Sequence, residues 1–404
     1  METKARVVII GGGVVGCSIL YHLAKRGWTD VVLLERQELT AGSSWHAAGN
    51  LFTLTAPGNA AVLQKYTIDL YPELERESGQ DCGLHYNGEL LVAKDAEEIK
   101  TLAIAHAFGK RYGIESEFIP PERAKELAPT LNTDDLTAIL HEKTAGYCDP
   151  ASVTHAFAKA ARNYGAAIHR HTPVLETNQR DDGKWDVVTE NGTITADYVV
   201  NAAGLWGREV AALADIRLPL MPVEHHYLVT EEIPEVAAMT TPHALLSYAD
   251  ANIYMRPEGK GLLIGAYEAK CVHWSEDGTP LDFGHELLPN DLSRMEAEFL
   301  EAVELMPCLG EAGIKSIING PMIFSPDLGP LIGPYPGKPG YFCANGVMTG
   351  FNQGGGIGKV LAEWIIDGEP SLDVSFWDVA RYGDYAGRRY AKSMTKYWYE
   401  NRSS

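Results

Sequence analysis

Cysteine is scarce in this chain, and no two cysteines have the spacing of metal ligands. The six cysteines lie far apart, without a Cys-x-x-Cys pair, at positions 17, 82, 148, 271, 308 and 343. A structural zinc site needs closely spaced thiolates, and a disulfide-stabilised fold needs a denser framework of cysteines. The sequence therefore favours neither, and we expect no metal site.

Basic residues and long apolar runs are also few. Lys and Arg number 34 against 54 Asp and Glu, and this net charge of -20 argues against nucleic acid or an anionic membrane as a partner. No apolar run approaches the roughly 20 residues of a membrane-spanning helix. The first apolar segment follows Met1 almost at once, which leaves no room for a signal or transit peptide. We expect a cytoplasmic protein without a membrane span, and a processed organelle form stays open.

Glycine is abundant, and its most informative cluster lies near the start of the chain. An apolar strand at residues 7–10 leads into a G-x-G-x-x-G turn made by Gly11, Gly13 and Gly16, and a helix is predicted over residues 14–26. In such a turn the first glycine permits the tight bend, the second lets the backbone approach a pyrophosphate, and the third lets the helix pack against the strand. The free N–H groups at the helix start would bind the pyrophosphate.

A second apolar strand, at residues 31–34, ends in Glu35. An acid about 20 residues beyond the glycine turn accepts hydrogen bonds from a ribose in dinucleotide-binding folds. Strand, turn, helix, strand and acid in this register predict an adenine dinucleotide site. Besides the three glycines, its predicted residues are Val14, Val15, Glu35 and Arg36.

Three later segments are rich in small residues, which let the backbone lie close to a ligand. The first is the loop 40–50, the second follows a buried strand over 196–201, and the third is a glycine cluster predicted at the start of a helix over 357–366. The ligand-binding residues predicted in and around these segments are Ser43, Ser44, Trp45, His46, Ala48, Gly49, Asn50, Leu51, Val174, Ala202, Ala203, Gly204, Trp206, Gly320, Asn352, Gln353, Gly354, Gly355 and Gly356.

The 404 residues suit two intertwined domains, because strand and helix signals alternate in some stretches and not in others. Helices are predicted over 59–78 and 150–163, and a hairpin over 185–195 with a type I′ turn at Asn191-Gly192. The tail is rich in aromatic residues, so we expect it to dock on the chain or on a partner. The predicted division is a dinucleotide-binding domain (1–83, 149–217 and 319–370), an inserted second domain (84–148 and 218–318) and the C-terminal tail (371–404).

Six segments together resemble the amine-oxidising flavoproteins of the D-amino-acid-oxidase-type superfamily, in particular the dimethylglycine dehydrogenase and sarcosine dehydrogenase group. The likeness runs over nearly the whole chain, through residues 40–49, 201–204, 225–227, 254–256, 325–327 and 352–356. It implies an α/β fold, in which a Rossmann-like FAD-binding domain carries an inserted α+β substrate domain built on an antiparallel sheet. It also implies FAD bonded covalently through its 8-methyl group to His46 in Trp45-His46-Ala47-Ala48-Gly49.

The resemblance implies oxidative N-demethylation of a small N-methyl amino acid such as dimethylglycine or sarcosine. A hydride would pass to flavin N5, and the resulting imine would hydrolyse to formaldehyde and the shorter amine. Oxygen, an electron-transfer flavoprotein or a quinone would reoxidise the flavin. Full-length members continue into a folate-binding half, and this chain stops near the junction, so we expect a stand-alone relative or the flavin half of a longer protein. A folate-binding domain or subunit would then dock on the tail.

Two rival functions remain open at this point. The flavin could instead oxidise a D-amino acid, a 2-hydroxy acid or glycerol phosphate, or the chain could be the flavin-bearing subunit of a larger complex. The first rival differs from N-demethylation in the substrate that the flavin oxidises, so flavin reduction tested with candidate substrates separates the two.

Two short strands supply the predicted catalytic residues. In the strand 223–229 side chains alternate between faces, so His225 and His226 point to opposite sides. The face with His225 is the more apolar one and is predicted to face the substrate. His226 is predicted to lie outside. Tyr254 and Arg256 share one face of the next candidate strand. Tyr254 is predicted to bind the amine or relay its proton, and Arg256 to bind a substrate carboxylate, although a solvated hairpin arginine is the more common case.

Overall fold

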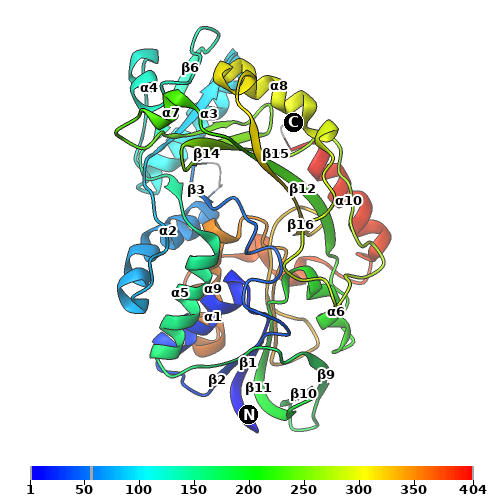
Figure 1. Cartoon of the computed structure of the whole chain (residues 1–404). Coiled ribbons are helices and arrows are strands. Elements are labelled where there is room, and N and C mark those ends of the chain that lie inside the picture. Colours follow the sequence, from blue (N-terminus) through cyan, green and yellow to red (C-terminus); the bar gives the residue numbers. More distant parts are fainter. Residues whose placement is uncertain (1, 55–57, 403–404) are drawn as a thin grey trace.

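Two β-sheets, one above the other, organise the computed structural model, which describes residues 2–54 and 58–402 (Figure 1). The first sheet has the strand order β17-β18-β11-β1-β2-β8, parallel from β18 to β8, with a β9–β10 hairpin added to β11. Its strands are β1 (Lys4–Ile10), β2 (Val31–Leu34), β8 (Ala167–His169), β9 (Val174–Gln179), β10 (Trp185–Thr189), β11 (Gly192–Asn201), β17 (Leu331–Pro334) and β18 (Tyr341–Asn345).

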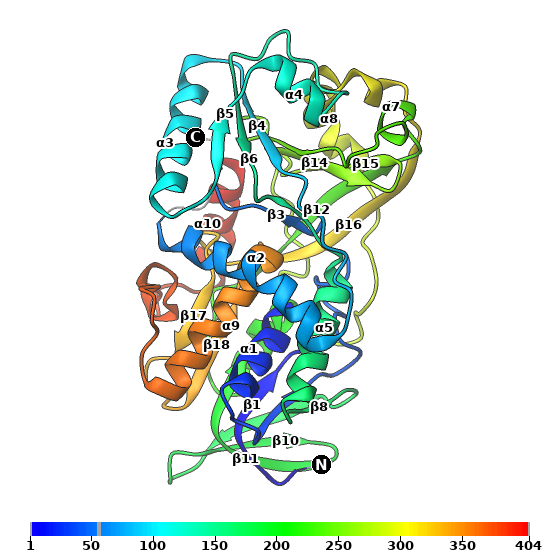
Figure 2. The same cartoon turned by 90° about the vertical axis from the view of Figure 1, so that its left-hand side faces the viewer.

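The strands of the first sheet carry apolar residues on both faces, so both faces are covered. Helices cover one of them. In β1, Val7 and Ile9 pack on the helix side, whereas Val8 and Ile10 enter the core on the opposite side. Figure 2 shows the helix layer in front of the sheet. It consists of α1 (Val14–Lys25), α2 (Asn59–Ser78), α5 (Pro150–Asn163) and α9 (Gly350–Asp367), while α6 (Gly207–Ala212) lies with the opposite core.

The second sheet has the order β16-β12-β15-β14-β13-β4-β6-β5, and its neighbours are antiparallel except for the pair β4 and β13. Its strands are β4 (Glu89–Ala93), β5 (Ser116–Phe118), β6 (Ala138–Glu142), β12 (Met221–Thr230), β13 (Leu245–Tyr248), β14 (Ile253–Glu258), β15 (Gly261–Ala266) and β16 (Ile314–Phe324). Between the sheets, β3 (Asn50–Leu51) pairs with β7 (Gly146–Tyr147).

Helices of the upper half of Figure 1 surround the second sheet. They are α3 (Ala96–Arg111), α4 (Pro121–Leu127), α7 (Pro234–Ala237) and α8 (Glu296–Leu305), whereas α10 (Arg388–Glu400) packs beside β12. Short 3-10 turns complete the chain at Gly204–Trp206, Leu292–Met295, Pro307–Gly310, Ser375–Trp377 and Val379–Arg381. In β14, Ile253 and Met255 face the apolar core on the side of α8, so Tyr254 and Arg256 lie on the opposite face of this sheet.

The predicted α/β class is confirmed, and α2 and α5 have the predicted bounds. Three local predictions are wrong. The hairpin pairs Thr189 with Gly192, so its turn lies one residue earlier than predicted. The strand predicted from residue 84 begins at Glu89, and α9 begins at Gly350 rather than near residue 357. The predicted domain boundaries stay a prediction, and β16 runs through the one at residues 318/319 without a break.

Candidate active site

The glycine turn lies where β1, α1 and β11 meet. Gly11 has a φ of 119°, and a Cβ there would come within 2.4 Å of the Ala202 carbonyl oxygen. A Cβ on Gly16 would lie 2.0 Å from the Gly11 oxygen. These close approaches account for glycine at both positions. They also place Ala202, from the end of β11, beside the turn.

Glu35 joins the end of β2 to the same turn. Its Oε2 accepts a 2.7 Å hydrogen bond from the Gly12 N–H, and its Oε1 accepts one of 2.8 Å from the Gln37 N–H. Burial raises the pKa of Glu35, although these backbone donors oppose that effect. A carboxylate has about four lone-pair sites, so both oxygens can also accept a ribose hydroxyl. Ser44 Oγ accepts from the Val14 N–H at 3.1 Å and brings the loop 40–50 onto the start of α1.

Contacts also locate three other predicted residues, Arg36, Ser43 and Val174. Arg36 stacks on the Trp206 ring with its guanidinium carbon 3.8 Å from the ring centre. Ser43 donates to the Pro321 carbonyl oxygen at 2.7 Å, close to Gly320 in sequence. Val174 is the first residue of β9. Two residues before it, the Thr172 N–H donates to the Glu35 carbonyl oxygen, so the chain passes Glu35 just before β9 begins.

The glycine cluster of α9 lies inside the helix and not at its start. Gly355 and Gly356 lie inside the helix, where a Cβ would come within 3.0 Å of Thr67 and 2.3 Å of Leu63 in α2. They permit close packing of two helices, so the prediction that they begin a helix is wrong. The first turn of α9 instead contains Asn352, which donates to the Asn50 carbonyl oxygen and accepts from the Phe52 N–H. Gly354 faces Val14 across the junction of α9 and α1.

The loop 45–50 and the segment 349–353 share a set of buried polar atoms without partners. Within residues 2–54 and 58–402, these atoms make no hydrogen bond: Trp45 Nε1, His46 Nε2, Asn50 Oδ1, Thr349 Oγ1 and Gln353 Oε1. Buried polar groups are normally satisfied, and such a cluster indicates a polar ligand. Since Asn352 ties the two segments together, the residues fit a flavin dinucleotide whose pyrophosphate lies at the glycine turn.

His46 lies against β16 at a point where only glycine leaves room. A Cβ on Gly320 would come within 2.2 Å of the His46 ring. Gly320 pairs with His225 across β16 and β12, so His46 and His225 flank the same position. Burial lowers the pKa of His46 to about 4. The imidazole is therefore neutral at pH 7 and offers a lone pair.

The structure brings His225 and Tyr254 together. His225 Nε2 and the Tyr254 hydroxyl are 2.9 Å apart; His225 is buried and Tyr254 is half-buried. Burial lowers the pKa of His225 to about 4 and raises that of Tyr254. At neutral pH the pair is therefore an uncharged hydroxyl and an uncharged imidazole, which can exchange a proton.

The prediction that His226 lies outside is wrong. Its side chain is fully buried, and its Nδ1 lies 2.7 Å from Glu268 Oε1. The alternation of β12 is as predicted, but both faces of this strand are covered, because the loop with Glu268 and Asp291 packs over the second face. Alternation predicts which side chains share a face and does not predict that one face meets solvent.

Arg256 is buried, with 6 % of its surface exposed, so the solvated hairpin arginine is the wrong interpretation. Its Nε donates to the Ala48 carbonyl oxygen at 2.7 Å, and its Nη1 donates to Glu258 at 2.6 Å. The guanidinium thus fastens the loop 40–50 to β14. In the described part of the chain its Nη2 has no hydrogen-bond partner, so this nitrogen alone is available for a substrate carboxylate, a role that stays a prediction.

Sequence patterns missed a group of residues behind His225. Glu268 and Arg294 come from the connection between β15 and α8, and Tyr399 comes from α10. Only the aromatic richness of the tail indicated that it docks, and it docks on the chain itself. No pattern marked Glu268, because its partners are 42 and 131 residues away in sequence.

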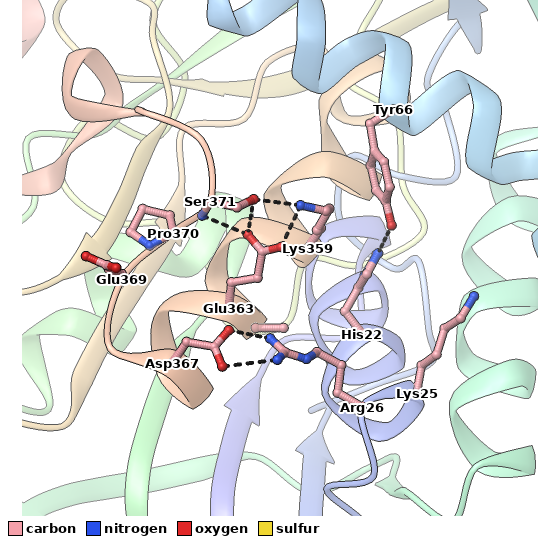
Figure 3. Close-up of a pocket in the computed structure, with 11 residues that line it drawn as sticks. His22, Lys25, Arg26, Tyr66, Lys359, Glu363, Asp367, Glu369, Pro370 and Ser371 are labelled. Carbon is pink, nitrogen blue, oxygen red and sulfur yellow. Dashed lines mark hydrogen bonds and ion pairs between the residues drawn. The ribbon is translucent and has the colours of Figure 1, made fainter.

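A separate surface pocket of about 460 Å³ lies between α1, α2 and α9 (Figure 3). His22 bonds the Tyr66 hydroxyl there, while Arg26 pairs with Asp367 and Lys359 with Glu363. None of the lining residues is a predicted site residue.

Among the described residues, no group of three or more His, Cys, Asp or Glu side chains could hold a metal. No helix of these residues is long and apolar enough to cross a bilayer.

Comparison with known proteins agrees with this geometry. Rat dimethylglycine dehydrogenase is 41% identical over 99% of this chain and 48% of its own length. Human sarcosine dehydrogenase is 36% identical over 95% of this chain and 42% of its own length. The chain thus spans about half the length of these curated relatives. The crystal structure of L-proline dehydrogenase from P. horikoshii superposes with a TM-score of 0.81 and 27% identity, covering 94% of this chain and 98% of the other.

A family model extends this similarity to most of the chain. The model described as FAD dependent oxidoreductase (DAO) matches residues 6–364, which include the glycine turn, the loop 40–50 and the paired strands β12 and β16. The chain belongs to the DAO family of FAD-dependent oxidoreductases.

Proposed function

We propose that this chain uses FAD to demethylate a small N-methyl amino acid oxidatively, with dimethylglycine or sarcosine as the model substrate. The observation that carries the proposal is the position of the His225–Tyr254 pair, directly across Gly320 from His46. A proton-exchanging pair thus lies beside the residue predicted to anchor the flavin. The names of the rat and human relatives support the substrate class.

Oxidation at carbon requires the amine nitrogen to be neutral, so the ammonium proton must leave first. The Tyr254 hydroxyl can accept this proton while passing its own to His225 Nε2, 2.9 Å away. When bound, FAD supplies a two-electron acceptor that takes a hydride from the N-methyl carbon. The resulting imine hydrolyses to formaldehyde and the demethylated amine. Arg256 shares a face of β14 with Tyr254, and its Nη2 is proposed to bind the substrate carboxylate.

The same proposal includes covalent FAD. His46 Nε2 is buried and makes no hydrogen bond to any residue that the structure describes, and the ring is neutral at pH 7. These two properties support its bonding to the flavin 8-methyl group. Glu35, the start of α1 and Ala202 would hold the adenosine and pyrophosphate, and Gln353 and Asn50 would face the ring end.

Anaerobic flavin bleaching tests the substrate class. Dimethylglycine, sarcosine and 4-methylaminobutanoate should bleach the bound flavin, whereas a D-amino acid, a 2-hydroxy acid and glycerol 3-phosphate should not. Bleaching by hydroxy acids and not by amines would refute the proposal. Oxygen, an electron-transfer flavoprotein and a quinone analogue, each added to the reduced protein, would then show which acceptor reoxidises it.

The C-terminal tail is proposed to dock a folate-binding domain or subunit. On α10, Tyr397 is 54% exposed and Trp398 44% exposed, and the chain spans about half the length of its curated relatives. Exposed neighbouring aromatic side chains are typical of protein interfaces. Steady turnover of the isolated chain with an artificial electron acceptor would show that the oxidation itself does not need the docked partner, which would then serve capture of the one-carbon product. Absence of turnover would favour a flavin subunit that needs its partner.

A further inference from the structure

A buried carboxylate lies behind the His225 ring. Glu268 has 1% of its surface exposed and has a donor on each oxygen. Its Oε1 lies 2.7 Å from His226 Nδ1 and 3.3 Å from Arg294 Nη2, and its Oε2 accepts a 2.6 Å hydrogen bond from the Tyr399 hydroxyl. A carboxylate so well supplied with donors stays ionised even when buried.

The protonation states of its neighbours follow from their partners. His226 Nε2 accepts the Asp291 N–H at 3.3 Å, so the ring proton is on Nδ1 and is donated to Glu268. Arg294 also pairs with Glu224, at 2.6 Å. One guanidinium therefore serves two carboxylates, and the cluster keeps a net negative charge. Burial alone would raise the pKa of Glu268, but the hydrogen bonds from His226 and Tyr399 outweigh it and hold that pKa below its ordinary value.

His225 meets this charge at its second nitrogen. Its Nδ1 lies 3.9 Å from Glu268 Oε2, too far for a hydrogen bond, and it makes none within residues 2–54 and 58–402. At that distance the attraction is electrostatic. The titratable and charged groups that face His225 are Tyr254, Tyr267, Glu268, His226, Arg294, Arg402 and, across Gly320, His46. Of these, only Glu268 is an anion, and the cations Arg294 and Arg402 oppose its effect on His225.

We infer that Glu268 is a positioning residue for His225, and that Tyr399 of the C-terminal helix holds Glu268 in the place where it acts. The carboxylate favours the tautomer of His225 with its proton on Nδ1. That tautomer leaves the Nε2 lone pair to accept the proton of the Tyr254 hydroxyl. When Tyr254 takes the ammonium proton of the substrate and passes its own on, His225 becomes an imidazolium, and Glu268 stabilises that charge.

This inference makes α10 part of the active site. Tyr399 is 2% exposed and its ring packs on Phe324 of β16 and on Tyr267, which itself lies on His225. Two residues earlier, Tyr397 is largely exposed. The buried face of the helix is thus the one that turns toward the catalytic pair. The inference rests on the proposed amine oxidation, in which the substrate ammonium gives up a proton.

The first experiment measures flavin reduction by dimethylglycine in the holoenzyme under anaerobic conditions across pH. Glu268→Gln keeps the shape of the side chain and removes its charge. We expect reduction at pH 7 to slow at least tenfold and to recover to within about threefold of the wild type near pH 10, where the free amine is available without the protein. Equal slowing at every pH, or no slowing, would overturn the inference.

A double-mutant cycle tests Tyr399. Tyr399→Phe should move the pH profile in the wild-type background and have no further effect in Glu268→Gln, because the hydroxyl acts through that carboxylate. Tyr390→Phe is the matched control, since Tyr390 lies on the same helix but contacts Tyr382 and Tyr385. Shifts that add fully in the double variant would overturn the role of Tyr399. Melting temperature and flavin absorbance verify that each variant is folded and loaded.

A second readout does not depend on turnover. In ¹⁵N-histidine-labelled holoenzyme, the His225 nitrogens, assigned with His225→Gln, should show the Nδ1–H tautomer in the wild type and a mixture in Glu268→Gln. An unchanged tautomer would overturn the inference. If no N-methyl amine bleaches the wild-type flavin, the proposed function fails while the tautomer result still decides the relation between Glu268 and His225.

Discussion

His46 combines three properties that a flavin anchor requires. It is buried, its Nε2 makes no hydrogen bond to the described residues, and its ring is neutral at pH 7. His46→Ala should abolish covalent attachment while leaving Glu35 and the glycine turn to bind FAD reversibly. After denaturing electrophoresis, the wild-type band should show yellow flavin fluorescence and the variant band none.

The matched control for that experiment is His285→Ala, because His285 also packs against Trp45 but bonds the Thr40 hydroxyl. Its band should stay fluorescent. A wild-type band without fluorescence would show that His46 is not covalently bonded to flavin.

At His225 and Tyr254 the expected effect is on rate and not on cofactor content. Proton transfer by a positioned side chain typically contributes about 10²- to 10⁴-fold, so His225→Gln and Tyr254→Phe should each slow flavin reduction by about 10²-fold at pH 7. Because the two groups exchange one proton over 2.9 Å, the double variant should be little slower than either single variant. Single-turnover reduction measures this, and rates equal to the wild type would remove the pair from the mechanism.

Among the elements, β16 offers the sharpest steric test. Gly320→Ala would place a methyl group 2.2 Å from the His46 ring, so the imidazole must move. We expect the covalent flavin fraction to fall severalfold or more while the β12–β16 pairing persists, since alanine keeps the backbone N–H and carbonyl. Gly387→Ala is the control, because a Cβ at that glycine meets nothing within 4 Å. Full covalent loading of Gly320→Ala would contradict the placement of His46.

The elements also show what sequence patterns can and cannot predict. Periodicity and the glycine turn predicted α1, α2 and α5 closely, because local sequence determines helix ends through caps and apolar spacing: Asp149, for example, accepts the Ser152 N–H at the start of α5. The start of α9 was missed because its glycines look like a loop until α2 is packed on them. Glycine content is ambiguous between a turn and close helix packing.

The face on which His225 lies was predictable, and the residues behind it were not. Alternation placed His225 and His226 on opposite faces of β12, which is a local property. Whether the second face is covered depends on the loop with Glu268 and Asp291, which approach His226 from 42 and 65 residues away along the chain. Pattern analysis of a single sequence carries no information on such contacts.

For the whole molecule, buried neutral histidines link stability to pH. Burial lowers the pKa of His22, His46 and His225 to about 4 in the folded chain. In the unfolded chain each imidazole takes up a proton with a pKa of about 6.5. Between these values the unfolded state binds more protons, so the free energy of unfolding decreases as the pH falls from about 6.5 to about 4. Each histidine should contribute a loss of about 1 kcal/mol by pH 5.5.

His22 isolates this effect from catalysis, because it lies in the pocket of Figure 3, between α1, α2 and α9, and not among the predicted site residues. His22→Gln should destabilise the chain at pH 7 by about 1 kcal/mol, since the bonds to Ser18 and Tyr66 are weakened. Because glutamine does not titrate, the variant should lose less stability than the wild type between pH 7 and pH 5. Denaturant unfolding at the two pH values measures the difference, and His155→Gln, at an exposed side chain, should reproduce the wild-type pH dependence. If His22→Gln did so too, the protein would tolerate a protonated His22 in its folded state.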